Sequence, residues 1–516
     1  MENENATLQN VLINVERLIN YAKSKLYLEE EDIIYTRNLL LDALSIKTAP
    51  YCGDTEDKPI QEILDNITEY AVQSKLIDPL DRILFETKIM GIVTPPPSKV
   101  IRTFDSLAGS KGVATATNYL YDISVASNYI RKVDIDKNIK WDYDGELGKI
   151  KITINLSKPE KDPKEVERAK NAPAGYPKCL LCQENVGYAG HAGHPARQTL
   201  RTIPIKLNDE DWFMQYSPYV YFDQHLIAIS EEHRPMDLNA ASFERMLDFV
   251  ELFPHYFIGS NAPLPIVGGS ILAHDHYQGG KKVLPMLDAQ NEKHYVSPKY
   301  SMVNFMTVKW YNSVIKLESK NRAQLVKAAM DIFEKWKGYS DESVNIIASS
   351  EADGKIIPHN TVTPVAYINR DGEYTIAMVL RNNRTDAAHP FGIFHPSEEL
   401  HNIKKESIGI IEVMGLFILP GRLSKEAMEI KDILTGAIPL DFKSLADDTN
   451  PMHKHLGMIA QLTADYGTSL SEEKASEAVT NYINTACEKI LKTTAVFKRD
   501  DAGRAAFEKF IQYALN

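Results

Sequence analysis

Cysteine is scarce in this sequence: four residues among 516. That number is too small for a disulfide framework in a chain of this length. Long apolar runs are also missing. No stretch approaches the roughly 20 apolar residues that a membrane-spanning helix needs, and the first ten residues lack the charged-then-apolar order of a signal peptide. We therefore expect a cytoplasmic protein without a membrane partner.

An excess of basic residues is absent as well. The formal net charge is −12, which argues against an extended nucleic-acid surface. A nucleotide ligand is not excluded, because it needs only a few local donors. No low-complexity tract and no internal repeat is legible in the sequence.

The composition is that of an ordinary globular protein, with 44% hydrophobic and 25% charged residues. A chain of this length is usually too long to fold around a single hydrophobic core. We predict three parts: a helical N-terminal region with a β-hairpin (residues 1–170), a nucleotide-binding catalytic part (171–300) and a C-terminal transferase part (301–516). A division near residue 240 is the alternative.

Periodicity predicts the individual elements. Apolar spacing predicts helices over residues 6–130, and alternation predicts a hairpin over 140–156 with its turn at Asp144-Gly145. Residues 157–170 are expected to form a surface connector. Further strands are predicted at 198–207, 212–216, 219–230, 343–348, 365–368 and 374–381, and further helices at 240–254, 322–337, 473–494 and 501–515.

The glycine-flanked stretch Gly268–Gly280 is the strongest candidate for chemistry. In extended backbone His274, His276 and Gln278 face the same way, with Asp275 and Tyr277 opposite. A neutral imidazole can attack phosphorus or bind a metal, and a glutamine can hydrogen-bond a phosphoryl oxygen. The simpler interpretation is two buried, hydrogen-bonded histidines in a strand.

A glycine-rich turn precedes these histidines. Gly268, Gly269 and Ser270 offer backbone N–H groups and a hydroxyl that could cradle a phosphate, and Asn261 opens the same segment. Many such turns are only turns, so this signal depends on its position four residues before His274.

Cys179 and Cys182 form the second candidate site. Two thiolates at this spacing can bind one tetrahedral zinc, but they could also be a redox pair or two ordinary buried thiols. Seven of the 14 histidines lie between His191 and His276, which favours a metal. Spacing leaves open whether His233, His274 or the pair His191 and His194 completes the site.

His191 and His194 have two other interpretations: surface histidines, or partners of Arg197 in holding a phosphate. The two remaining cysteines, Cys52 and Cys487, lie in helical contexts without partners, and we expect both to be structural.

Six motifs resemble one family. They are Cys179-Leu-Leu-Cys182-Gln-Glu-Asn185, His194-Pro-Ala-Arg197-Gln198, Gln215-Tyr-Ser217-Pro-Tyr219, Glu232-His233-Arg-Pro-Met236, Val267–Gly280 and His401–Pro420. In this order they resemble the UDP-glucose–hexose-1-phosphate (galactose-1-phosphate) uridylyltransferases, in their second, firmicute-type branch. The motifs run from about residue 175 to 425.

The resemblance implies an α+β fold with an antiparallel sheet, related to the histidine-triad nucleotide-binding proteins. It implies reversible transfer of UMP between UDP-glucose and galactose 1-phosphate, giving glucose 1-phosphate and UDP-galactose, in galactose metabolism. His276 would be the nucleophile that carries the uridylyl group, and Gln278 would steady that intermediate.

The resemblance also assigns ligands and substrate contacts. A structural zinc would be held by Cys179, Cys182, His233 and His274. The candidate substrate-binding residues are Arg197, Ser217, Asn261, Gly268, Gly269, Ser270, Lys404, Lys405 and Glu412.

Two features depart from the better-known branch of the family. Asp275 replaces a proline between the histidines, and strand alternation should turn its carboxylate away from His276, towards a backbone or arginine partner. The second, iron-binding site of that branch has no ligands that can be matched here, except that His395 is a candidate.

Two other functions stay open. One is a histidine-triad nucleotide hydrolase or phosphorylase, which would not need the long C-terminal half with Lys404, Lys405 and Glu412. The other is a zinc-stabilised interaction module without catalysis, which would leave Gln278 and the Gly-Gly-Ser turn unexplained. The preferred hexose 1-phosphate, a second metal and a homodimer are not decided by the sequence.

Overall fold

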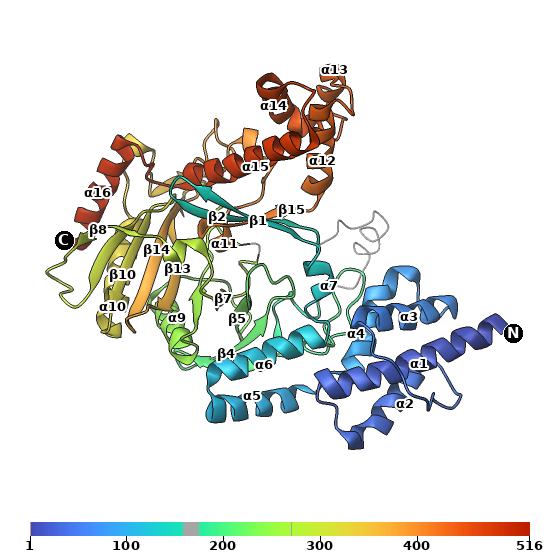
Figure 1. Cartoon of the computed structure of the whole chain (residues 1–516). Coiled ribbons are helices and arrows are strands. Elements are labelled where there is room, and N and C mark those ends of the chain that lie inside the picture. The colour runs from blue at the N-terminus through green and yellow to red at the C-terminus, as the bar shows by residue number, and fades with distance from the viewer. Residues whose placement is uncertain (1, 158–174, 270) are drawn as a thin grey trace.

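The protein is described from a computed structural model that covers residues 2–157, 175–269 and 271–516 (Figure 1). It is an α+β structure, as predicted: a helical N-terminal region precedes a large antiparallel sheet. Among the described residues, no helix has the length and apolar character needed to cross a membrane.

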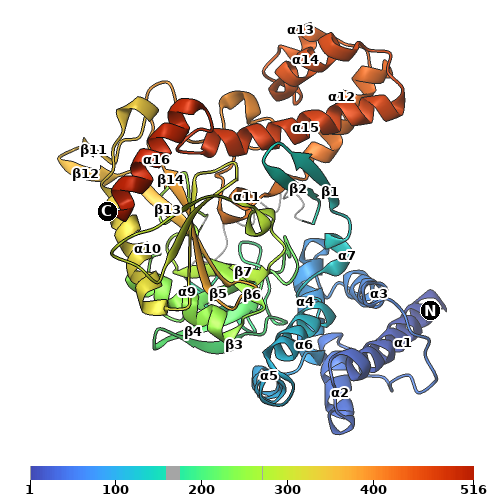
Figure 2. The ribbon, with the colours of Figure 1, turned by 60° about the vertical axis from the view of Figure 1, so that its left-hand side comes forward.

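The N-terminal region is helical, which confirms the prediction for residues 6–130. Buried apolar side chains at helical spacing, such as Ile63, Leu64 and Ile67, hold these helices together. Figure 2 shows the first four helices as a bundle beside the large sheet. The helices are α1 (Glu2–Lys25), α2 (Ile33–Ala43), α3 (Ile60–Gln73), α4 (Arg82–Val93), α5 (Pro97–Lys111), α6 (Val113–Ala126) and α7 (Lys132–Ile135).

The predicted hairpin is confirmed as β1 (Ile139–Gly145) and β2 (Gly148–Asn155). Its turn is Glu146-Leu147, not Asp144-Gly145, because Gly148 has the positive φ of 138° that the tight reversal needs. The apolar run after residue 408 supplies α11 (Ile410–Val413) and β15 (Leu416–Pro420), and β15 pairs parallel with β2.

The large sheet has ten strands in the order β3-β4-β5-β7-β6-β13-β14-β10-β9-β8. All neighbours are antiparallel. The strands are β3 (Ile203–Leu207), β4 (Glu210–Tyr216), β5 (Leu226–Ser230), β6 (Tyr256–Gly259), β7 (His276–Lys281), β8 (Asn291–Tyr295), β9 (Asn304–Val308), β10 (Val314–Ser319), β13 (Asn360–Ile368) and β14 (Tyr374–Asn382).

The sheet contains a repeat that the sequence does not reveal. In each half, three strands are followed by a helix and two more strands: β3-β4-β5, α9 (Ala240–Leu252), β6-β7, then β8-β9-β10, α10 (Arg322–Lys337), β13-β14. The spatial orders 3-4-5-7-6 and 8-9-10-14-13 match strand for strand, and the halves join where β6 pairs with β13. The repeat is one of topology, so inspection of the sequence missed it.

The two faces of the sheet are covered differently. Tyr277 and Trp212, on one face, share a core with α9 and α10. On the other face, α11, β15 and the helical segments between residues 422 and 494 cover mainly the second half, and they reach the first half at Phe257 and Gly259 of β6. The first half carries there a small apolar cluster of Leu181, Phe213 and Ile229. We call this side of the first half the open face, because the small cluster takes the place of the helical layer that covers the second half.

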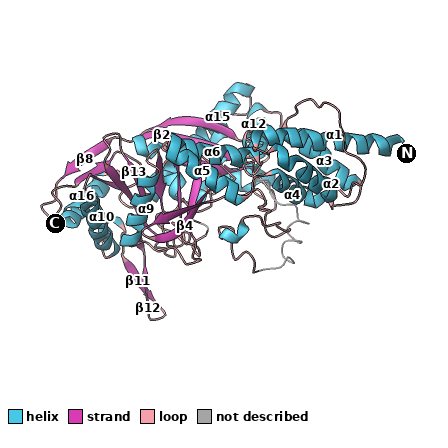
Figure 3. Ribbon diagram, turned by 90° about the horizontal axis from the view of Figure 1, so that it is seen from below, coloured by secondary structure: helices cyan, strands magenta, loops and turns pink. Residues whose placement is uncertain are grey.

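Several predicted elements differ in extent. Residues 198–202 and 219–225 form loops, because their backbone groups bond within the loops and Val220 and Gln224 have positive φ. Residues 343–348 are not a strand; a short hairpin follows them, β11 (Ser349–Ala352) and β12 (Lys355–Pro358), and it projects from the body in Figure 3.

The C-terminal part is more helical than predicted. The expected helices are confirmed as α15 (Glu472–Thr494) and α16 (Asp501–Leu515). Three unexpected ones precede them: α12 (Arg422–Thr435), α13 (Phe442–Leu445) and α14 (Leu456–Tyr466). The boundary near residue 170 and all of the connector except Ser157 fall within 158–174, outside the described residues. The boundary near 300 falls between β8 and β9, so the division into parts stays a prediction.

Candidate functional site

The site is built around the first residues of β7. His276 lies opposite Ile229 of β5, and Gln278 lies opposite Ile227 and Gly259. His276 and Gln278 share the open face, as predicted from strand alternation. His274 does not follow the alternation: it lies in a turn before the strand.

The opposite face of β7 is anchored in the core. The ring of Tyr277 stacks on Trp212 with a centroid distance of 5.0 Å, and its hydroxyl lies 3.2 Å from Arg245. This packing fixes the register of β7, and a one-residue slip would move His276 to the wrong face.

The hydrogen bond of His276 defines its reactive nitrogen. Nδ1 lies 2.8 Å from the carbonyl oxygen of His274. A carbonyl only accepts, so Nδ1 carries the proton and Nε2 has the lone pair. No described residue hydrogen-bonds Nε2. Burial lowers the pKa of His276 to about 4, so the ring is neutral near pH 7. A neutral imidazole with an available Nε2 can act as a nucleophile.

His225 is a part of the site that the sequence did not single out. Its Nε2 lies 3.0 Å from Gln278 Oε1, and burial lowers its pKa to about 4. The neutral ring donates from Nε2, so Gln278 Oε1 is the acceptor and the NH₂ group of the amide is available on the open face. The only sequence signal was the general histidine excess between His191 and His276.

Asp275 points away from His276, as predicted. Its Oδ2 lies 3.5 Å from Arg234 Nε and 3.7 Å from Arg245 Nη1. Burial raises the pKa of this carboxyl to about 6, while the two guanidinium groups oppose that rise. The negative charge is therefore held on the far side of the strand.

Cys179, Cys182, His233 and His274 lie together, and the four ligand atoms fall within 4.8 Å of one another. The Cys179 Sγ–Cys182 Sγ distance is 3.6 Å, Cys179 Sγ–His274 Nδ1 is 3.3 Å and Cys182 Sγ–His233 Nδ1 is 3.1 Å. Tetrahedral zinc with its usual bond lengths needs S–S and S–N separations of about 3.8 and 3.5 Å. The four side chains can therefore hold one metal ion after shifts of a few tenths of an ångström.

The cluster is braced by residues around it. His274 Nε2 lies 2.8 Å from the carbonyl oxygen of Ser230, which leaves Nδ1 as the ligand atom. Asn185 donates to the carbonyls of Cys179 and Cys182 at 2.9 and 2.7 Å. His194 Nε2 contacts Asn185 Oδ1 at 2.6 Å, so His194 supports the cysteine turn instead of binding the metal.

The other predicted substrate-binding residues form two groups. In the first, Asn261 Oδ1 accepts a hydrogen bond from the backbone N–H of Ile410 at 2.9 Å. A Cβ at Gly269 would lie 2.6 Å from Asn261 Nδ2, and one at Gly268 would lie 2.2 Å from a carbonyl oxygen. Both glycines are needed for the close approach of this turn to the segment of residues 261–264. Ser270 lies outside the described residues.

Lys404 and Glu412 belong to the same group but neutralise each other. Lys404 Nζ lies 3.0 Å from Glu412 Oε1 and also donates to the Ile418 carbonyl. Glu412 Oε2 accepts from the N–H of Gly409. Lys405 lies over the ring of Phe391. Lys404 and Glu412 would bind a substrate only if their ion pair broke and contacts with the substrate replaced it.

Arg197 and Ser217 form the second group. Arg197 stacks over the Tyr129 ring and lines a cavity of about 190 Å³ between the helical region and the loop after β4. Ser217 is buried and opens that loop, its N–H donating to the His225 carbonyl at 2.8 Å.

His395 belongs to no metal cluster among the described residues. His395 is buried and its Nδ1 lies 3.2 Å from the Pro396 carbonyl. Within the described part of the chain, the Cys179 cluster is the one group of three or more cysteine, histidine or acidic residues placed to hold a metal.

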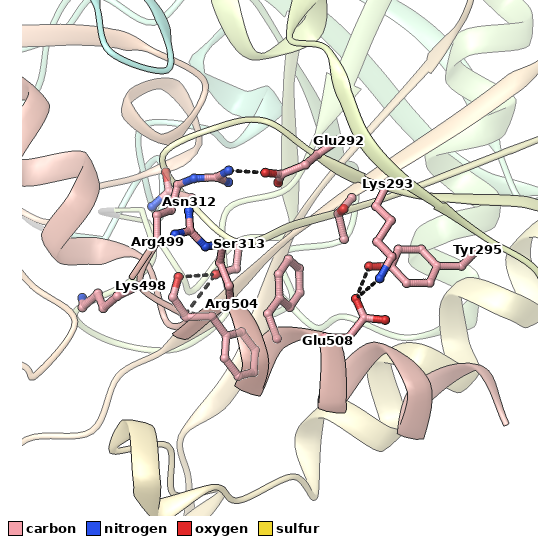
Figure 4. Close-up of a pocket in the computed structure, with 12 residues that line it drawn as sticks. Glu292, Lys293, Tyr295, Asn312, Ser313, Lys498, Arg499, Arg504 and Glu508 are labelled. Atoms are coloured by element: carbon pink, nitrogen blue, oxygen red, sulfur yellow. Dashed lines mark hydrogen bonds and ion pairs between the residues drawn. The ribbon is translucent and has the colours of Figure 1, made fainter. Parts of the chain in front are cut away.

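A cavity of about 210 Å³ lies at the other edge of the sheet, between β8, β9 and α16 (Figure 4). Three of its charges are paired, Lys293 with Glu508, Arg499 with Glu292 and Arg504 with Asp501. A fourth, Lys498, donates to backbone carbonyls. It holds none of the histidines of the site, so we do not assign the chemistry to it.

Comparison with known proteins agrees with this geometry. The family model described as galactose-1-phosphate uridyl transferase, N-terminal domain, matches residues 27–235, and the C-terminal domain model matches residues 249–445. The chain is thus a nucleotidyltransferase. It belongs to the galactose-1-phosphate uridylyltransferase family.

Curated relatives match over almost their whole length. The galactose-1-phosphate uridylyltransferase of Caldanaerobacter subterraneus is 49% identical, over 98% of this chain and 99% of the relative. Those of Fusobacterium nucleatum and Bacillus subtilis are 46% and 42% identical, each over 97% of this chain and 98% and 97% of the relative. A crystal structure of a yeast Ap4A phosphorylase covers 60% of this chain and 88% of its own, at 12% identity and a TM-score of 0.30, too low to add to the assignment.

Proposed function

We propose that this protein transfers UMP reversibly between UDP-glucose and galactose 1-phosphate through a uridylyl group on His276. The observation that carries the proposal is the pairing of a neutral His276, whose Nε2 is left for reaction, with Gln278 on the same face of β7. Membership of the family supplies the substrates.

The proposed reaction has two displacements. Nε2 of His276 attacks the α-phosphorus of UDP-glucose, forming a P–N bond, and the P–O bond to glucose 1-phosphate breaks. A phosphate oxygen of galactose 1-phosphate then attacks the same phosphorus, forming UDP-galactose, and the electron pair of the P–N bond returns to Nε2. Covalent catalysis of this kind lets one pocket serve both hexose phosphates in turn.

Neighbouring residues suit a nucleotide ligand. The NH₂ of Gln278 is placed to donate to a phosphoryl oxygen as negative charge develops there. Ile227 and Ile229, opposite the reacting residues, and Leu181 beside them give an apolar surface on which a nucleoside could lie.

We further propose that the bound metal is zinc, held by Cys179, Cys182, His233 and His274. Two thiolates and two imidazoles are a usual zinc donor set, and four protein ligands leave no open position, so the ion would be structural. Its contribution here would be to fix the turn that leads into β7, because His274 is both a ligand and the hydrogen-bond acceptor for His276.

The test is to incubate the protein with UDP-glucose alone and measure its intact mass. We expect one added uridylyl group per chain and release of glucose 1-phosphate. Adding galactose 1-phosphate should remove the group and yield UDP-galactose. A protein that gains no mass would contradict the proposal, and one that discharges UMP to water or phosphate as fast as to the sugar phosphate would be a hydrolase or phosphorylase instead.

A further inference from the structure

A chain of contacts with the buried Gln224 at its centre leads from the N-terminal helices to the open face of β7. It begins at Asn118 on α6, whose Oδ1 accepts a 2.7 Å bond from Gln224 Nε2. The other end of the Gln224 amide, Oε1, accepts from the hydroxyl of Tyr256 on β6. Gln224 is 4% exposed, and both ends of its amide are satisfied by these two partners. The residue is thus clamped between α6 and the central sheet.

Gln224 has an unfavourable backbone conformation. Its φ is 53°, in the left-handed region that is unfavourable for a residue with a Cβ. Its carbonyl oxygen sits against Gly280 of β7, where a Cβ would come within 2.6 Å. Strain of this kind persists where surrounding contacts over-determine it, and it is concentrated at functional sites. Here the contacts that hold it are Asn118, Tyr256 and the strand that carries His276.

The next residue after Gln224 is His225. Its ring is held between Phe222 and Tyr221, with centroid distances of 4.6 and 5.5 Å. Its Nε2 reaches Gln278 Oε1. The backbone conformation of Gln224 therefore sets where the His225 ring lies, and His225 sets which end of the Gln278 amide faces the ligand.

We propose that α6 is a positioning element of the catalytic centre, acting from Asn118 through Gln224 and His225 on Gln278. The inference rests on the proposed function, because it assigns the role of the helical region in that same reaction. Asn118 touches no reacting atom. Its effect is on the orientation of the Gln278 amide, which must present NH₂ and not oxygen to the phosphoryl group.

The matched variants are Asn118→Ala and Asn118→Asp. Asn118 is an exposed helix residue, so alanine should leave α6 intact, since it is the best helix former. Asn118→Ala removes the acceptor for Gln224, and we expect kcat for UMP transfer to fall on the order of 10-fold with little change in KM. Asn118→Asp keeps an acceptor oxygen and should retain most of the activity. Gln224→Leu, which removes both bonds, should lose more than Asn118→Ala.

A double-mutant cycle separates positioning from loss of stability. Gln278→Ala alone is expected to lose on the order of 10²-fold in kcat, as one lost transition-state donor does. If Asn118 acts through Gln278, adding Asn118→Ala to Gln278→Ala should cost nothing more. Tyr21→Phe is the control, because it removes a hydrogen bond to the Ala126 carbonyl in the same helical region but outside this chain of contacts.

The outcomes are distinguishable. Wild-type protein that forms no uridylyl adduct would overturn the proposed function itself. An active wild type with an equally active Asn118→Ala and Gln224→Leu would overturn only the positioning role. If Asn118→Ala lowers kcat by the same factor with and without the Gln278 side chain, α6 merely stabilises the fold. The same conclusion follows if Tyr21→Phe lowers kcat as much as Asn118→Ala does.

Discussion

At the residue scale, the proposed chemistry depends on which nitrogen of each histidine is bonded. His276 and His274 are two residues apart, yet they present opposite atoms: His274 offers Nδ1 to the metal cluster because its Nε2 is bonded to Ser230, and His276 retains Nε2 because its Nδ1 is bonded to His274. Two backbone carbonyls, those of Ser230 and His274, therefore determine which nitrogen each histidine has left for its proposed role.

Replacement of the proposed nucleophile should be rescued from solution. His276→Gly should form no adduct with UDP-glucose, since the attacking atom is gone, but it should use a uridylyl-imidazole or regain turnover with free imidazole. The wild type should show parallel double-reciprocal lines for its two substrates, and its adduct should be acid-labile and base-stable, as a phosphoramidate is. Intersecting lines, or an adduct on His276→Gly, would move the nucleophile elsewhere.

His225 should make the stability of the protein depend on pH. Burial lowers its folded-state pKa to about 4, below the ordinary value of about 6.5. The unfolded chain then binds the proton first, so the contribution is complete above pH 6.5 and is lost as the pH falls towards 4. Between pH 7 and pH 5 the wild type should lose about 2 kcal/mol more free energy of unfolding than His225→Gln. Urea titrations at both pH values measure this, and equal losses in the two proteins would mean that folding does not lower the pKa of His225.

At the element scale, the turn before β7 is held from both sides. The Cys179–Cys182 turn lies on one side and the carboxylate of Asp275, between Arg234 and Arg245, on the other. No single helix or strand supplies these contacts. The position of His276, the first residue of β7, therefore depends on a cluster whose members are up to 95 residues apart in sequence.

The metal cluster should control both metal content and the position of β7. Purified protein should contain about one zinc per chain. Cys179→Ser should lose it, melt at a lower temperature and form the uridylyl adduct more slowly, because the turn carrying His274 loosens. Cys52→Ser is the control, since Cys52 is an exposed thiol outside the cluster. Elemental analysis and thermal melts measure these changes, and a fully active, equally stable metal-free protein would contradict the assignment.

At the scale of the whole molecule, the helical region and the sheet share one core. Val11 and Leu120 of the N-terminal helices belong to the same buried apolar cluster as Trp212 of the first half-sheet and Trp336 beside the second. A region that shares its core with the catalytic half has no separate interior of its own. The helices should therefore not unfold alone.

Cooperative unfolding tests this directly. All four tryptophans lie outside α1–α7, so fluorescence reports the rest of the molecule, while far-UV circular dichroism at 222 nm includes the N-terminal helices. We expect both signals to change at the same urea concentration, because coincident transitions are the mark of one cooperative unit. A first transition seen only by circular dichroism would show that the helical region is independent.

Local patterns predicted much of the secondary structure. Apolar residues with a period of 3.6 predicted α3, and α10 covers the residues predicted for it, 322–337. Period-2 alternation placed His276 and Gln278 on one face and Asp275 on the other. The strand ends at 198–202 and 219–225 were wrong, because apolar composition is the same in a strand and in a buried loop. Helices α12, α13 and α14 were missed, although α12 carries an apolar stripe at helical spacing, formed by the buried Leu423, Ile430, Ile433 and Leu434.

The sequence by itself determined the chemistry available: a CxxC pair, a His-x-His-x-Gln run between glycines, and the motifs of one transferase family. These signals are local, so spacing carries them. Tertiary structure decided the rest: which histidines meet the two thiols, that the uncovered face of β7 holds His276, that His225 orients Gln278 from 53 residues away, and that two halves of one sheet repeat a topology. Those relations depend on strand order and on packing across the sheet. Both arise only when residues that are distant in sequence come together in the fold.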